Sequence, residues 1–228
     1  MHTRMRIMGI VGVAAVASMG TAAALVVALG WWVALALAAI VLLAYFVIAR
    51  PRLGRWGATV GEVGRAMPGD EVLGTAPSIT RAITISAGPE RIWPWLVQIG
   101  FGRGGWYSYD WVDNDDRPSA DQILPEFQHL EVGDRVLMAP DMGPTVRALE
   151  PNRFMLCGGE RDTWCLGLYP LDEFHTRLVS RWRARWPRTP ATVFWLLISE
   201  PGSFIMERKM LLGIKRRVER MDSTLTIR

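Results

Sequence analysis

An uncharged apolar stretch near the N-terminus limits what this chain can fold into. From Ile7 to Ala49, 43 consecutive residues contain no Asp, Glu, Lys, Arg, His, Asn or Gln. The hydrocarbon core of a bilayer is about 30 Å thick, and roughly 20 helical residues cross it. Forty-three residues are too many for one crossing and match two crossings joined by a tight turn. We therefore predict a transmembrane helical hairpin over residues 1–49.

A break inside the stretch places the turn. Gly30 is followed by Trp31 and Trp32. Glycine weakens a helix, and tryptophan prefers the interface between membrane and water. The two crossings are therefore expected over residues 7–29 and 32–49.

Basic residues on both flanks predict the orientation of the hairpin. Arg4 and Arg6 precede the stretch, and Arg50, Arg52 and Arg55 follow it. Two crossings leave both clusters in the cytoplasm, as the positive-inside rule requires, whereas one crossing would misplace one cluster. A cleaved signal peptide is the alternative, and cleavage near residues 14–24 would still leave the second run as an anchor. We predict a multi-pass protein of the cell (inner) membrane with a cytoplasmic domain.

The rest of the chain has the composition of one soluble domain. All 22 acidic residues lie after position 61. Residues 50–72 read as a basic juxtamembrane linker with a short helix over 55–67, and residues 73–228 are long enough to form one core. The net charge of +4 comes partly from the membrane flanks. Because no Cys-His cluster or basic recognition helix accompanies it, nucleic-acid binding is not expected. Cys157 and Cys165 form no CxxC pair and are expected to be reduced thiols.

Periodicity in the soluble part predicts an α+β domain. A strand over 78–86 precedes a helix that starts at Gly88-Pro89, with a kink at Pro94. A period of two then indicates five antiparallel strands, over residues 135–139, 145–149, 153–157, 163–169 and 176–186. Pro190 and a break at Pro201-Gly202 bracket two C-terminal helices. The expected fold is a curved antiparallel sheet around a long C-terminal helix, with apolar space between them.

The last strand has two different faces. Leu178, Ser180 and Trp182 alternate with arginines, so Trp182 is expected to line the core or cavity, and Arg183 to lie on the opposite face. An alanine at position 183 is accordingly expected to change stability by no more than about 0.5 kcal/mol.

Four segments resemble one known superfamily. They are the strand over 80–86, WPWLVQIG at 93–100, GRGGWYSYDW at 102–111 and MERKMLLGIKR at 206–216. Together they resemble the SRPBCC superfamily, the START-like or birch-pollen-allergen-type helix-grip fold, and within it the uncharacterised bacterial membrane-anchored proteins. The resemblance covers about residues 68–221.

The resemblance implies a hydrophobic cavity for lipids, polyketides or other apolar molecules. The first function hypothesis is a membrane-tethered module whose partners are membrane lipids and a hydrophobic small molecule. The second is a polyketide cyclase/dehydratase-like enzyme that uses the same cavity, and the third is a protein-interaction module with a filled core. Neither a catalytic set nor a cofactor is expected, because the chain has three scattered histidines, too few for a two-histidine iron site. The sequence does not fix the oligomeric state.

The ligand-binding residues expected from this reasoning lie on four segments. They are Trp106, Tyr109, Asp110, Trp164, Trp182 and Met210. Tyr109 and Asp110 could be polar contacts at a cavity mouth, or proton donors in the enzyme hypothesis. The alternative is structural: Asp110 caps a helix and the aromatic residues around it belong to the core.

Overall fold

The computed structural model describes residues 18–24, 27–28, 30–187 and 189–225. The chain separates into two compact units, residues 1–53 and 54–228, and each is described by itself. The domain boundaries expected from the sequence stay a prediction.

The N-terminal unit is dominated by one apolar helix. It runs from Trp31 to Gly54 through α2 (Trp31–Ala44), the π-helical turn η1 (Tyr45–Ala49) and α3 (Arg50–Gly54). The helix has 24 residues, and its most apolar 18-residue window has a mean hydropathy of 2.7. It is the one helix of the described residues long and apolar enough to cross a membrane. Gly30 begins it with a φ of +77°, which glycine adopts without steric cost, so the expected break lies there. The helix passes Ala49, where the sequence prediction ended it.

The first expected crossing lies largely outside the described residues. Residues 18–24 and 27–28 of it are helical. The two-crossing hairpin therefore stays a prediction.

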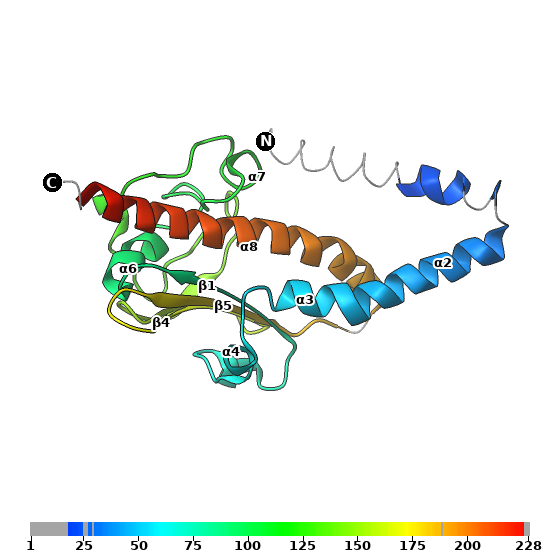
Figure 1. Ribbon diagram of the computed structural model, residues 1–228, viewed down its shortest axis with the longest axis horizontal. Helices are drawn as coiled ribbons and strands as arrows, with labels where there is room; N and C mark the ends of the chain where they lie inside the picture. Colours follow the sequence, from blue (N-terminus) through cyan, green and yellow to red (C-terminus); the bar gives the residue numbers. More distant parts are fainter. Residues whose placement is uncertain (1–17, 25–26, 29, 188, 226–228) are drawn as a thin grey trace. The chain divides into compact units, whose positions relative to one another are not determined.

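The second unit is built on a five-stranded antiparallel sheet (Figure 1). Its strands are β1 (Ser78–Ile85), β2 (Thr145–Glu150), β3 (Phe154–Gly158), β4 (Asp162–Pro170) and β5 (Thr176–Ala184). The spatial order is β1-β5-β4-β3-β2, so the first strand pairs with the last. The strand expected over 135–139 is wrong. That segment makes only isolated bridges, because the backbone of Val136 and Met138 bonds to the turn that follows it.

A long helix, α8 (Pro190–Leu225), lies along one face of the sheet (Figure 1). The two C-terminal helices expected from the sequence are wrong, because α8 continues through Pro201. Proline removes one backbone donor but does not end a helix whose neighbouring turns remain bonded. Helix α6 (Pro89–Val97) begins at Pro89 as predicted and retains Pro94 inside it. The α+β helix-grip class is confirmed.

The other face of the sheet is covered by the segment that precedes β1. It contains α4 (Val60–Gly64) and α5 (Asp70–Leu73), so the single helix expected over 55–67 is wrong in extent. Helix α4 is set by a capping box in which Thr59 and Glu62 each bond the other's backbone N–H. Buried apolar residues pack beneath this cover: Met67, Ala82, Leu156, Cys165 and Val179.

Arginines of β5 bind this cover to the sheet. Arg177 pairs with Glu62, and both Arg181 and Arg183 pair with Asp70. The predicted alternation of β5 is confirmed by its register, but the face with the arginines is not open to solvent. Arg183 also donates to the carbonyls of Gly74 and Ala76, so its replacement is now expected to cost more than the roughly 0.5 kcal/mol inferred from the sequence.

The two cysteines are separate buried thiols. Cys157 lies opposite Trp164 and Cys165 lies opposite Leu156, so the thiols are not cross-strand partners. Both cysteines are free, as expected, and burial raises the pKa of each to about 12.

Candidate functional site

The candidate site is the space between α8 and the sheet face toward it. The register of the sheet places Ile79, Arg81, Ile83 and Ile85 of β1 on this face together with Leu178, Ser180 and Trp182 of β5 and Trp164, Leu166 and Leu168 of β4. Helix α8 contributes Met210, Leu211, Ile214 and Val218. One continuous apolar cluster results.

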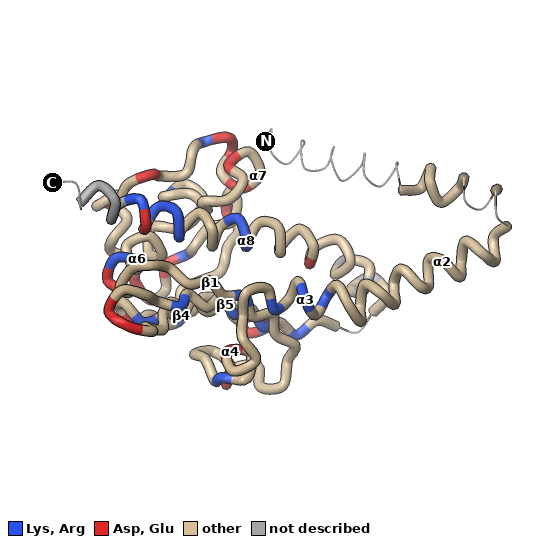
Figure 2. Tube along the Cα trace, in the orientation of Figure 1, with Lys and Arg blue, Asp and Glu red and all other residues tan. Residues whose placement is uncertain are grey.

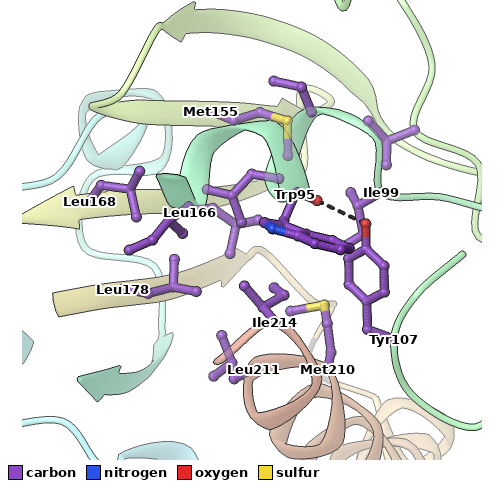
Figure 3. Close-up of a cluster of buried hydrophobic side chains, with 14 of the residues drawn as sticks. Trp95, Ile99, Tyr107, Met155, Leu166, Leu168, Leu178, Met210, Leu211 and Ile214 are labelled. Carbon is purple, nitrogen blue, oxygen red and sulfur yellow. Dashed lines mark hydrogen bonds between the residues drawn. The ribbon is translucent and has the colours of Figure 1, made fainter. Parts of the chain in front are cut away.

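One end of this space is a closed core (Figure 3). Trp95 of α6 lies between the strands and α8 and is fully buried, and so are Leu166, Leu178, Leu211 and Ile214. These side chains come from three layers of the fold. Because apolar side chains packed this closely leave no room for a ligand, these residues form the structural core of the domain.

A row of three tryptophans crosses the space. The ring centroids of Trp106 and Trp164 are 5.7 Å apart, and those of Trp164 and Trp182 are 6.2 Å apart. Trp164 donates from Nε1 to the Ser180 hydroxyl at 2.9 Å, and Trp106 donates to the carbonyl of Leu137 at 3.1 Å. Trp106 and Trp164 are buried, whereas Trp182 is half-buried. Three of the residues expected from the sequence therefore lie side by side.

A buried ion pair lies beside the tryptophan row. Arg81 is 1% exposed and pairs with Glu207 of α8, and its guanidinium lies 5.3 Å from the ring centre of Phe204. Ser180 is directly opposite Arg81 in the sheet. The sequence reasoning missed both charged residues. Arg81 shares one face of β1 with Ile79 and Ile83. A charged residue on this otherwise apolar face of the strand could have identified it from the sequence.

The other end of the space is less enclosed. Ile79, Trp182, Phe204 and Trp56 are half-buried there. Trp56 and Phe204 meet edge to face with ring centroids 6.4 Å apart. The site therefore has a closed apolar core at one end and partly exposed aromatic side chains at the other. The Arg81–Glu207 pair lies between the two ends.

Tyr109 and Asp110 make their contacts with Lys209 and Ser119, and not with the tryptophan row. The Ser119 hydroxyl donates to Asp110 at 2.5 Å, and the Lys209 ammonium lies 5.3 Å from the centre of the Tyr109 ring. Helix α7 (Asp110–Asp113) begins with Tyr109 as its cap, without a side-chain bond, so Asp110 is not the cap. Tyr109 thus meets α8 through Lys209, and Asp110 meets the loop that contains Ser119.

Tyr107 fixes this segment against α8. Its hydroxyl donates to the carbonyl of Trp95 at 3.1 Å (Figure 3), and burial raises the pKa of its phenol. Its carbonyl approaches Gly213 so closely that a Cβ there would lie 2.2 Å from the oxygen. Ser108 donates to the carbonyl of Met206 at 3.0 Å. Gly213, which the sequence analysis included only in a motif, is therefore required by this contact.

Asp113 has an unusual environment. It is 8% exposed, and burial, followed by the charge of Asp110, raises its pKa to about 7. The Ser108 hydroxyl and the backbone of Tyr109 offset part of this rise. Among the described residues, neither of its carboxylate oxygens has a hydrogen-bond partner of normal geometry. A carboxyl that stays protonated close to neutral pH can donate a proton.

The described part of the chain shows no metal-binding cluster. No group there of three or more His, Cys, Asp or Glu side chains is arranged to hold an ion.

Comparisons with known proteins find similarity among solved structures. Protein MLL2253 from Mesorhizobium loti matches at 16% identity and a TM-score of 0.39, over 63% of this chain and 98% of its own. The polyketide cyclase-like protein Cgl2372 from Corynebacterium glutamicum matches at 18% identity and a TM-score of 0.33, over 64% and 93%. Aha1 from Colwellia psychrerythraea matches at 17% identity and a TM-score of 0.36, over 63% and 96%. No family model and no curated protein matches the chain. At these identities and TM-scores, no property of these proteins is carried over to this chain.

Proposed function

We propose that this protein is a membrane-tethered module that binds a hydrophobic small molecule or lipid between the sheet and α8. The observation that supports it is the half-buried tryptophan end of the space, backed by the buried Arg81–Glu207 pair. Removing an arginine and a carboxylate from water costs several kcal/mol per ion before their attraction is counted. In a site for an amphipathic ligand, the ion pair would bind the polar head group. The apolar body of the ligand lies along Trp164 and Trp182, and its polar head contacts Arg81.

The tether in this proposal is the apolar helix from Trp31 to Gly54. Its described side chains expose a long apolar surface, and Arg50 and Arg52 follow the most apolar part. The proposal keeps the two-crossing hairpin and a cytoplasmic domain at the inner membrane. Reporter fusions at residues 1 and 228 test it, because both must report cytoplasm. Opposite sides for the two ends would exclude the hairpin.

Native mass spectrometry of the detergent-extracted full chain tests the ligand. We expect an amphiphile to remain with the wild-type protein and to be lost from Trp182→Ala and from the double variant Arg81→Gln/Glu207→Gln. The double variant removes both charges together, which avoids leaving one of them buried alone. Trp111→Ala is the matched control, because Trp111 is 40% exposed and lies on α7. Equal ligand content in Trp182→Ala and Trp111→Ala, or no ligand on the wild type, would favour the filled interaction module.

A second candidate function is an enzyme of the cyclase or dehydratase type. Asp113 favours it, since a general acid needs a pKa close to the working pH. The same mass measurement on Asp113→Asn separates binding from catalysis, with Asp115→Asn as the control. A ligand that differs in mass between Asp113→Asn and the wild type indicates turnover. The same mass in both supports the binding module.

A further inference from the structure

The first half of α8 has an apolar stripe open to solvent. Phe194, Ile198 and Ile205 are 66%, 42% and 52% exposed. At about 100° per residue, an ideal helix places the three side chains within roughly 40° of one another. They therefore form one narrow face, which we call the α8 stripe.

Charge is distributed unevenly along the same helix. From Thr189 to Met206 the only charged residue is Glu200, and helical spacing puts it on the opposite side from Ile198. The basic residues of α8 gather in its second half (Figure 2). That second half also buries Met210, Leu211 and Ile214 against the sheet. The core thus occupies the second half, while the α8 stripe is left exposed.

The α8 stripe lies close to Trp56, which follows the apolar helix in the chain. Gly54 ends that helix, and Trp56, two residues later and so at most about 8 Å away, contacts Phe204. Phe204 is the neighbour of Ile205, and Ile198 is six residues, about 9 Å, further along α8. Trp186, which is 48% exposed, lies in the segment that leads into α8. An aromatic ring of this kind is favoured at the level of lipid headgroups.

We propose that the α8 stripe lies in the interface of the lipid bilayer to which the chain is tethered. The proposal rests on the membrane tether of the proposed function. The uncharged run over residues 190–199 has ten residues, about half of what a crossing needs. An in-plane helix with its apolar face among the headgroups accommodates it. In a membrane-tethered chain, lipid then covers this exposed apolar surface.

The test uses the full chain reconstituted in phosphatidylcholine/phosphatidylglycerol vesicles. Ile198→Cys and, as the control, Arg216→Cys are labelled with an environment-sensitive fluorophore and exposed to lipids with a nitroxide near the headgroup. Arg216 is exposed and lies in the second half of α8. The native thiols stay unlabelled, because both are buried and their pKa is about 12. We expect most emission at position 198 to be quenched and emission at position 216 to be unchanged.

The other outcomes separate this inference from the tether itself. Protein that resists alkaline extraction but shows no quenching at position 198 overturns the docking and leaves the tether intact. A blue-shifted but unquenched probe means that a second copy of the chain covers the α8 stripe, which also overturns the docking. Equal quenching at both positions overturns it as well. Protein released from the vesicles by alkali overturns the tether and the docking together.

Discussion

Replacing Asp70 by Asn would remove a carboxylate that pairs with two arginines at once. Asp70 accepts hydrogen bonds from Arg181 and Arg183, each at 2.6 Å, and from the backbone N–H of Met67 at 3.0 Å. The side chain of Arg181 is only 2% exposed. The variant would therefore leave a buried guanidinium without its counter-charge, between the sheet and the cover formed by α4 and α5.

The expected loss is large. Breaking a buried ion pair by removal of one partner costs about 3–5 kcal/mol, whereas an exposed pair contributes about 0–1 kcal/mol. For a domain of this size, 1 kcal/mol lowers the melting temperature by about 2–4 °C, so the shift should be about 6–20 °C. Glu150→Gln is the matched control, because Glu150 and its partner Arg153 are 45% and 70% exposed.

The assay is thermal unfolding of the full chain in detergent, followed by tryptophan fluorescence at pH 7 and again at pH 3. Burial raises the pKa of Asp70, but the bonds from Arg183 and Met67 and the charge of Arg181 outweigh it, so the net pKa lies below 3.8. The stabilisation is therefore present above pH 3.8 and is lost as pH falls through the lower pKa of the folded state. The difference between wild type and Asp70→Asn should shrink at pH 3. Equal melting of Asp70→Asn and Glu150→Gln at pH 7 would refute the structural role of the cover.

Three further results are expected. Asp113→Asn should stabilise the protein at pH 8 by up to about 4 kcal/mol and have little effect near pH 4. The reason is that the raised pKa of Asp113 makes the wild type progressively less stable as the pH rises from 3.8 to about 7. A difference between the two proteins that does not depend on pH would be inconsistent with this. Gly213→Ala should lose about 1–3 kcal/mol, as its Cβ would strike the carbonyl of Tyr107, and a melting curve like that of the wild type would contradict that contact. A thiol reagent should modify Cys157 and Cys165 only as fast as the protein unfolds, since both are buried, and rapid labelling of the native protein would show that they are accessible.

Local chemistry in the sequence was sufficient to predict several elements. The apolar run, broken at Gly30, predicts a helix from residue 32, and the helix begins one residue earlier, at Trp31. Glycine marks the break because it adopts a positive φ without steric cost. The alternation of Trp182 with the arginines predicts the two faces of β5, because side chains of a strand alternate by geometry. The turn residues between the later strands predict antiparallel hairpins, which need no distant partner.

Tertiary structure decided what each face meets, because that depends on segments far apart in the chain. From the sequence, the face of β5 that carries Arg183 was expected to be solvent-exposed. In the structure, residues 57–76 cover this face and supply Asp70, which is more than a hundred positions away in the chain. Arg81 could be placed on the inward face by period, but its partner Glu207 comes from α8, 126 residues later. Pro201, read locally as a break, lies within a continuous helix along the sheet. Periodicity reports which side chains share a face, whereas the free energy of burying a charge depends on the partner that only the folded chain brings to it.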